Sequence, residues 1–284
     1  MLRRQTRLRR EFLYQKSLEQ KERQIFDRKQ RVKELLAKGK QVPRGQEVGE
    51  REQRMDAAQS DPQTHIDDEY AQAGIDDPRV LITTSRDPSS KLAQFAKEMR
   101  LCFPGATRIN RGNYVMKELA DACRTNNITD LIVLHEHRGV PDAMMISHFP
   151  HGPTVLFTLN NVVLRHSLEG VQQATVSEQY PHLIFEGFGS KLGQRIRDVL
   201  KYCFPVPKED AKRTMTFVNE GDFISFRHHV FVKTSHKEVQ LAEVGPRFEM
   251  RPFEIRQGTI EQTEADSEWQ LRAYTRTGRK KNML

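Results

Sequence analysis

Two passages of the chain, about a hundred residues apart, repeat one pattern of apolar and polar positions. An apolar triplet at 80–82 (VLI) and another at 183–185 (LIF) each precede a loop, and then a stretch with apolar residues at helical spacing. Each stretch ends in Cys-Phe-Pro, and proline cannot continue a helix. The pattern therefore predicts a strand, a loop and a helix, written twice. The inward helical positions are Leu92, Phe95, Ala96, Met99 and Phe103 in the first copy and Leu192, Ile196, Val199, Leu200 and Cys203 in the second.

The remaining segments complete an α/β pattern. Residues 113–127 predict a second helix, and the apolar run at 130–137 predicts a strand buried on both faces. Near Pro252 the apolar positions change phase, which indicates a bulge or a bend. We expect two α/β half-domains packed as one pseudo-symmetric body. Further strands are predicted at 143–149 and 154–164, with a turn at 139–142 before them, and at 215–221, 222–234, 237–245 and 246–258.

Charge divides the chain into regions. Residues 1–40 hold fourteen basic and five acidic residues, and 41–77 hold three basic and ten acidic ones. We predict a long basic helical arm at 1–40, an acidic irregular linker at 41–77 and a body at 78–260. The halves of the body are about 78–175 and 176–260. Residues 261–284 form a C-terminal tail.

The arm has a ragged apolar stripe, which leaves two interpretations. It is either a solvated helix that frays alone or a helix that orders on RNA or on a partner protein. Its candidate partner-binding residues are Arg3, Arg4, Arg7 and Phe12. The single tryptophan, Trp269, lies among acidic residues, where it either anchors a partner or packs on its own domain.

Bulk composition narrows the class of protein. Of 284 residues 37% are hydrophobic, and the mean hydropathy is −0.70, so a core must share the chain with exposed polar segments. The net charge of +8 favours a polyanionic partner. Three cysteines without a CxxC pair exclude a thiolate zinc site and favour a reducing, intracellular compartment. We expect no membrane span, secretory signal or cofactor.

Candidate chemistry begins at the loop after the first repeated strand. Ligands of α/β sheets gather beyond the carboxyl ends of strands, and a helix N-terminus suits phosphate. Thr84, Ser85, Arg86 and Lys91 are the candidates there. Alternatively the loop is a plain turn in which Ser89 or Ser90 caps the helix. If strands 80–82 and 131–135 are parallel neighbours, Arg86 and Arg138 project from the same edge. Further candidates for RNA contact are Arg108, Arg111, Arg227 and His229.

Other motifs carry little chemistry. The glycines of 187–193 (GFGSKLG) match neither a dinucleotide nor a Walker loop, which favours a structural use. His135 and His137 at a strand end are too few for a metal site. His228 lies in an apolar phase and is predicted to be packed. We find no nucleophile elbow, catalytic triad or paired-carboxylate motif, so no catalytic residue is assigned.

Several long segments resemble the Brix-domain proteins of ribosome biogenesis. They are ITTSRDPSSKL from 82, DLIVLHEHRGVPDAMMISHFPHGPT from 130 and GPRFEMRPFEIRQGT from 245. The resemblance covers roughly residues 78–259, the basic arm and the tail. It implies the Brix fold, two α/β halves each similar to the anticodon-binding domain of class II tRNA synthetases.

Within the family, the resemblance is strongest to the member found in the U-three small nucleolar ribonucleoprotein. It implies a nucleolar, non-catalytic RNA-binding factor of the small-subunit processome. Such a factor promotes pairing of U-three small nucleolar RNA with precursor ribosomal RNA for early 18S processing. The implied protein partners are a small S-four-like protein and a large acidic scaffold protein.

Two other functions remain open. In the first, the chain is a protein-interaction module whose sheet and arm are covered by the acidic scaffold, and its RNA contacts are incidental. In the second, it is a nucleotide-dependent enzyme that uses the 187–193 loop. Because aromatic residues are few and mostly at core phases, we expect base stacking to be minor.

Overall fold

The computed structural model describes residues 76–168, 176–207, 211–233, 238–272 and 283–284, with scattered positions before residue 76. Contacts divide the chain into two units, Met1–Asp76 and Asp77–Leu284, and the fold described here is that of the second. The predicted arm and linker lie almost wholly outside the described residues.

The first repeat and the segments after it form the predicted strands and helices, together with the short strand β2 and the turn η2, which the sequence analysis did not predict. Ser89 caps the first helix, because its hydroxyl accepts the N–H of Leu92 at 3.2 Å. The elements are β1 (Val80–Thr84), α3 (Ser90–Cys102), β2 (Thr107–Arg108), α4 (Met116–Thr125), β3 (Asp130–His137), β4 (Val140–His148), β5 (Thr154–Val163) and the 3₁₀ turn η2 (Arg165–Ser167).

The turn predicted at 139–142 lies earlier in the chain than the sequence suggested. Arg138 and Gly139 have φ angles of 50° and 75°, and β4 already begins at Val140. Two successive positive φ angles are typical of the tight turn that matches the twist of paired strands. The turn places Arg138 at the tip of the β3–β4 hairpin.

The second repeat begins with the same succession of a strand and a helix. Ser190 caps this helix by accepting the N–H of Gly193 at 2.9 Å, as Ser89 does in the first copy. The elements are β6 (His182–Glu186), α5 (Lys191–Tyr202), β7 (Arg213–Glu220), β8 (Phe223–Lys233), β9 (Val239–Glu243), β10 (Arg247–Arg256) and β11 (Ser267–Gln270).

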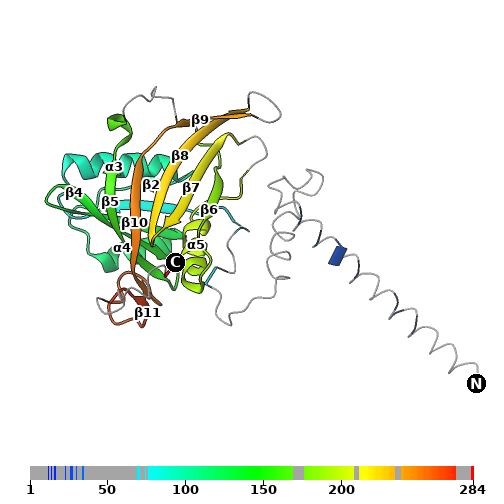
Figure 1. The fold of residues 1–284 in the computed structure, drawn as a ribbon. Helices are drawn as coiled ribbons and strands as arrows, with labels where there is room; N and C mark the ends of the chain where they lie inside the picture. Colours follow the sequence, from blue (N-terminus) through cyan, green and yellow to red (C-terminus); the bar gives the residue numbers. More distant parts are fainter. Residues whose placement is uncertain are drawn as a thin grey trace, which may run out of the picture. The chain divides into compact units, whose positions relative to one another are not determined.

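One sheet runs through both halves, in the order β2-β1-β3-β4-β5-β10-β8-β7-β6 (Figure 1). In the first half β1 is parallel to β3, and the antiparallel strands β4 and β5 follow. In the second, β6 is parallel to β7, and the antiparallel strands β8 and β10 follow. The halves join where β5 pairs with β10. The predicted pseudo-symmetry is therefore present, as two copies joined edge to edge.

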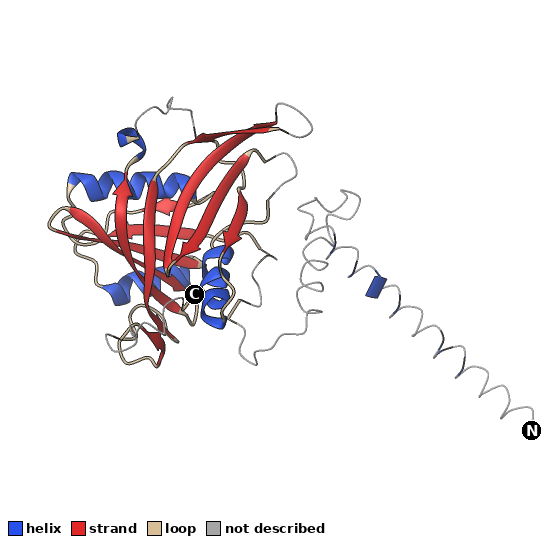
Figure 2. Ribbon diagram, in the orientation of Figure 1, coloured by secondary structure: helices blue, strands red, loops and turns tan. Residues whose placement is uncertain are grey.

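An aromatic row on the inner face of the sheet gives the halves a common core. Phe95 of α3 meets Phe248 at 5.8 Å between ring centroids, and Phe248 stacks on Phe226 at 4.7 Å. Phe226 lies 5.2 Å from Phe217, which stacks on Phe185 of β6 at 4.9 Å. Figure 2 shows α3 crossing behind the long strands. The first helix thus packs on strands of the second half.

The opposite, outer face is covered in the first half by α4. Leu81, Leu131 and Val133 pack there with the α4 residues Leu119 and Cys123. Their burial explains why β3 appears in the sequence as an unbroken apolar run.

The second half has the same strands but no helix between β6 and β7. Leu81 pairs with Leu131 in the first half, and the equivalent pair is Ile184 with Thr216. Leu81 is 8% exposed, whereas Ile184 is 48% exposed. Among the described residues, then, the outer face of the second half is left open.

A buried arginine connects the two halves by hydrogen bonds. Arg213 of β7 is 1% exposed, and its guanidinium donates to the carbonyl oxygens of Leu101 and Cys102 at the end of α3. Its Nε donates to His228 Nε2 at 2.9 Å, and His228 Nδ1 donates to the Gly245 carbonyl at 2.8 Å. The negative end of the α3 dipole stabilises the buried charge. His228 is packed, as predicted, and neutral.

Replacing Arg213 by leucine should destabilise the body. The carbonyl oxygens at the end of α3 would lose their buried donor, and each such loss costs about 1–3 kcal/mol. We expect the free energy of unfolding in urea to fall by at least about 3 kcal/mol. Arg197→Leu on α5, which removes a partly exposed arginine bonded to its neighbour Asp198, should change it by under about 0.5 kcal/mol. Equal losses in the two variants would contradict the role given to Arg213.

The neutral state of His228 should appear in the pH dependence of stability. Burial, and then the charge of Arg213, lower the pKa of His228 to about 3, whereas in an unfolded chain it is about 6.5. Between these values the unfolded chain holds the extra proton, so stability is complete above pH 6.5 and falls as pH drops. The slope from this group approaches about 1.4 kcal/mol per pH unit. Urea unfolding between pH 7.5 and 5 measures how the free energy of unfolding depends on pH. This slope should be shallower in His228→Gln than in the unchanged protein, and identical slopes would refute the neutral state of His228.

Candidate nucleic-acid interface

The carboxyl ends of β1 and β3 meet at one edge of the sheet, because the two strands are parallel. Arg86 follows β1 and is exposed, and Arg138 lies in the turn after β3 and is exposed. The sequence placed both arginines on one edge on the condition that these two strands are parallel neighbours, and the structure meets that condition. Arg108 ends β2, the neighbour of β1, and Arg111 lies three residues after it.

Two of these side chains, Arg86 and Arg111, form an electropositive group with His135. Partial burial lowers the pKa of Arg111, and the positive charge of Arg86 lowers it further. Burial also lowers the pKa of His135, and the charge of Arg111 adds to this against the opposing effect of Asp142. His135 Nε2 is buried and has no hydrogen-bond partner among the described residues. Guanidinium groups held near one another favour an anion, since they bind phosphate through several N–H groups.

The loop before α3 does not offer its backbone to a phosphate. Glu136 accepts the N–H of Ser89 at 2.7 Å and also the Ser89 hydroxyl. The N–H of Ser85 donates to the Leu134 carbonyl at 2.8 Å, and Thr84 is only 3% exposed. A carboxylate already occupies the place at the helix N-terminus that an anion would take. The backbone N–H groups of Ser85 and Ser89 already have acceptors within the protein, which favours side chains for RNA contact at this edge.

The loop before α5 is closed in a comparable way. The N–H of Ser190 donates to the Leu284 carbonyl at 3.2 Å, and Asp222 Oδ1 accepts the N–H of Leu284 at 3.0 Å. A side chain at Gly193 would meet the Leu284 oxygen at 2.6 Å, and one at Gly187 would meet the Asn219 oxygen at 2.6 Å. Gly187 and Gly193 thus have the structural use that the sequence suggested, whereas a side chain at Gly189 would meet no atom within 4 Å.

The candidates of the second half lie apart from the arginine group, whereas Lys91 and Arg108 belong to elements next to the edge. Lys91 is exposed in the first turn of α3, and Arg108 donates to Asn110 Oδ1 at 3.1 Å. Arg227 and His229 belong to β8, and four strands separate β8 from β1 in the sheet. They are half-buried on the outer face. Burial lowers the pKa of His229, and Glu243 opposes that shift. The second-half candidates form a separate group.

The proposed partner-binding residues are only partly described. Arg3, Arg4 and Arg7 lie outside the described residues, and Phe12 is 58% exposed. Trp269 lies in β11 opposite Ile255 of β10 and is half-buried. The tail therefore adds a strand to the sheet, and Trp269 belongs to it.

Other chemistry finds little support in the described part of the chain. No three His, Cys, Asp or Glu side chains there converge as metal ligands. None of its helices is long and apolar enough to cross a membrane. All three cysteines are buried, and burial raises the pKa of Cys102 to about 12 and that of Cys123 to about 11. Thiols of this kind are poor nucleophiles.

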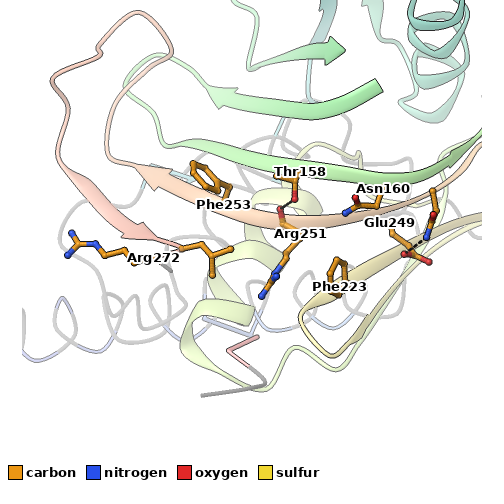
Figure 3. Close-up of a pocket in the computed structure, with 9 residues that line it drawn as sticks. Thr158, Asn160, Phe223, Glu249, Arg251, Phe253 and Arg272 are labelled. Carbon is orange, nitrogen blue, oxygen red and sulfur yellow. Dashed lines mark hydrogen bonds between the residues drawn. The ribbon is translucent and has the colours of Figure 1, made fainter. Parts of the chain in front are cut away.

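The sequence did not single out a groove on the outer face where β5, β10 and β8 meet (Figure 3). Phe223, Arg251 and Phe253 line it. One signal was present: the phase change near Pro252 corresponds to a register shift between Pro252 and Glu254, which brings Phe253 to the surface.

Comparison with known families now adds to this geometry. The sequence pattern of the Brix domain matches residues 85–254. This chain belongs to the Brix-domain family. The Brix-domain match includes the arginine edge and most of the groove.

Relatives extend the similarity over the whole chain. It is 51% identical over 292 residues to the "U3 small nucleolar ribonucleoprotein protein IMP4" of Rattus norvegicus, covering 100% of this chain and 99% of that one. The Saccharomyces cerevisiae protein of the same name is 52% identical over 293 residues, with 100% of both chains covered. A Brix domain-containing protein of Caenorhabditis elegans is 47% identical over 285 residues, covering 100% of this chain and 97% of that one.

Two solved structures align with part of this chain at low identity. One is a probable ribosomal biogenesis protein from Aeropyrum pernix K1, with 23% identity, a TM-score of 0.45, and coverage of 61% of this chain and 96% of that one. The other is Mil, an archaeal Imp4-like protein, with 16% identity, a TM-score of 0.39, and coverage of 63% and 99%.

Proposed function

We propose that this protein is a non-catalytic RNA-binding assembly factor of the U3 small nucleolar ribonucleoprotein. In this role it works in the nucleolus, within the small-subunit processome, and promotes pairing of U3 small nucleolar RNA with precursor ribosomal RNA for early 18S processing. Its protein partners are a small S-four-like protein and a large acidic scaffold protein. The names of relatives that are about half identical over their whole length support this function.

The observation that carries the proposal is the pair formed by Arg86 and Arg111. The positive charge of Arg86 lowers the pKa of Arg111 beyond the effect of its partial burial, and an unliganded protein gains nothing from holding the two guanidinium groups together. A phosphate between or beside them removes the repulsion. The same charges reduce the repulsion between two RNA strands that are brought together, which is the task of a factor that assists pairing.

A non-catalytic role agrees with the side chains available. The three thiols are buried, and the glycine loop at 187–193 is closed by the protein's own backbone. The proposal therefore assigns RNA binding to the edge arginines Arg86, Arg108, Arg111 and Arg138, with Lys91, Arg227 and His229 as outlying contacts.

Neutralising the edge should weaken RNA binding without weakening the fold. In Arg86→Gln with Arg138→Gln, the slope of log K against log salt for a single-stranded precursor rRNA fragment should fall by about 1.4, or about 0.7 per lost phosphate contact. Fluorescence anisotropy from 50 to 200 mM salt measures it. Because Arg86 opposes the charge of Arg111, the melting temperature should stay the same or rise.

The matched control is Lys191→Gln with Arg197→Gln, which removes two charges from α5 in the second half. It should leave the slope within about 0.3 of the unchanged protein's, because it loses no phosphate contact. If the two double variants had equal effects, the edge arginines would act only through the net charge of the protein. A specific role for the edge in RNA binding would then be refuted.

A second candidate function, a protein-interaction module on the acidic scaffold, is favoured by the open outer face of the second half. Ile184 is 48% exposed at the position where Leu81 is covered by α4. Val218, on the neighbouring strand, is half-buried and equivalent to Val133. A partner helix that covered these positions would bury the apolar surface that α4 buries in the first half.

Introducing negative charge at this open face should weaken binding of the acidic scaffold. Ile184→Asp with Val218→Asp should reduce nuclease-resistant capture of the purified acidic scaffold by roughly tenfold or more, as expected for an interface core. Leu241→Asp on β9, which is 63% exposed, is the control and should capture normally. Undiminished capture by the double variant would rule out this face as the docking site.

A further inference from the structure

The groove on the outer face lies at the junction of the two halves. Its walls come from β5, β10 and β8 and from the two residues after β11, and its volume is about 950 Å³. The β5–β10 pairing that joins the halves runs along its floor. It is lined by Thr158, Asn160, Asn161, Phe223, Glu249, Arg251, Phe253, Leu271 and Arg272.

Two phenylalanine rings in the groove face solvent for reasons that the backbone explains. Phe223 begins β8 with its neighbour Ile224 buried, so strand alternation places the ring on the outer face, where it is 37% exposed. Phe253 is the extra residue at the register shift of β10 and is 39% exposed. Leu271 holds the backbone of Phe253 in place by donating its N–H to the Phe253 carbonyl at 2.8 Å.

Cationic and amide groups accompany the rings. Arg251 lies over Phe223, with its Cζ 5.1 Å from the ring centroid, and Figure 3 shows the two side chains next to each other. Arg272, from the segment after β11, also lines the groove, and Figure 3 shows its guanidinium on the side away from Phe223. The carboxylate of the groove, Glu249, accepts the Asn161 side-chain amide at 2.9 Å. Flat apolar faces and positive charge therefore meet in one hollow.

We propose that this groove binds single-stranded RNA, with bases stacked on Phe223 and Phe253 and the backbone phosphates held by Arg251 and Arg272. Thr158 and Asn160 face the same hollow and are able to hydrogen-bond a base edge. The proposal rests on the RNA-binding function given above and adds a stacking site that the edge arginines lack. It also reverses the expectation that stacking is minor.

The chemistry of the groove favours RNA over an acidic peptide or an apolar helix. An acidic peptide satisfies the guanidinium groups but offers no π-face to two exposed rings. An apolar helix covers the rings but offers no anion to Arg251. A nucleotide supplies both groups a few ångströms apart, and every base has a face to stack, so binding tolerates different sequences.

The test uses a fluorescein-labelled single-stranded oligouridylate of about twelve nucleotides, longer than a single stacking site requires. Phe223→Ala and Phe253→Ala should each weaken its binding by roughly 5- to 150-fold, the range for loss of one stacked base. The salt slope should not change, because no phosphate contact is lost. Phe253→Trp should bind like the unchanged protein. Arg251→Gln and Arg272→Gln should each lower the slope by about 0.7.

Leu241→Ala on β9 is the matched control for removal of an exposed apolar side chain, and the melting temperature of each variant verifies its fold. A second measurement needs no variant: photo-crosslinking of 4-thiouridine RNA to the unaltered protein should map to peptides that contain Phe223 and Phe253.

The outcomes separate this site from the proposed function. If the ring variants bind normally and crosslinks fall only at the Arg86 edge, the groove is not an RNA site, although the protein remains an RNA-binding factor. If the unaltered protein fails to retain RNA above non-specific levels, the proposed function itself fails. If the ring variants lose the scaffold protein and keep RNA, the groove is a protein-docking site and the inference is overturned.

Discussion

The buried guanidinium of Arg213 is the contact on which the relation between the two halves depends. It reaches from β7 of the second half to the last carbonyl oxygens of α3 in the first, while His228 and Gly245 tie it to the β8 strand and the turn before β10. A charge in this position costs several kcal/mol to desolvate, and that cost is offset only if every N–H has an acceptor. The contact therefore tolerates one arrangement of the halves, which makes the continuous sheet rigid at its centre.

A rigid centre has consequences for both proposed RNA surfaces. The groove crosses the β5–β10 junction, and the spacing between Phe223 on β8 and Phe253 on β10 is set by the pairing of these two strands within the second half. The arginine edge lies on the far side of β3 and β4, and it is fixed by the parallel pairing of β1 with β3. Because both proposed surfaces are built on paired strands, RNA binding there would cost little conformational entropy.

Much of the architecture followed from local sequence, because each duplicated unit carries its own strand, cap and helix pattern. The capping role of Ser89 and the buried phase of His228 are examples. What could not be predicted depends on residues far apart in the chain. Glu136 reaches Ser89 across 47 positions, and the interaction of Arg111 with Arg86 arises only after β1, β2 and β3 have paired. A one-dimensional pattern contains no signal for either.

The groove escaped prediction for a different reason. Phe223 and Phe253 each lie beside a buried residue in a strongly apolar strand, and in such a strand one ring looks like any other core position. Only the exact register decides which rings face outward, and a one-residue shift exchanges the two faces of a strand. At Pro252 that shift occurs inside the strand, which is why the phase change was visible but its surface consequence was not.

The two closed loops restrict how a protein of this fold is able to hold a polyanion. Backbone N–H groups at the starts of α3 and α5 are the usual anion sites of an α/β fold, and here Glu136 and the Leu284 carbonyl take them. Affinity must then come from guanidinium groups on long side chains and from aromatic faces, neither of which depends on the identity of a base. Selectivity would then depend on the shape of an RNA that spans both the edge and the groove. It would be set by the distance between these two surfaces and not by any single residue.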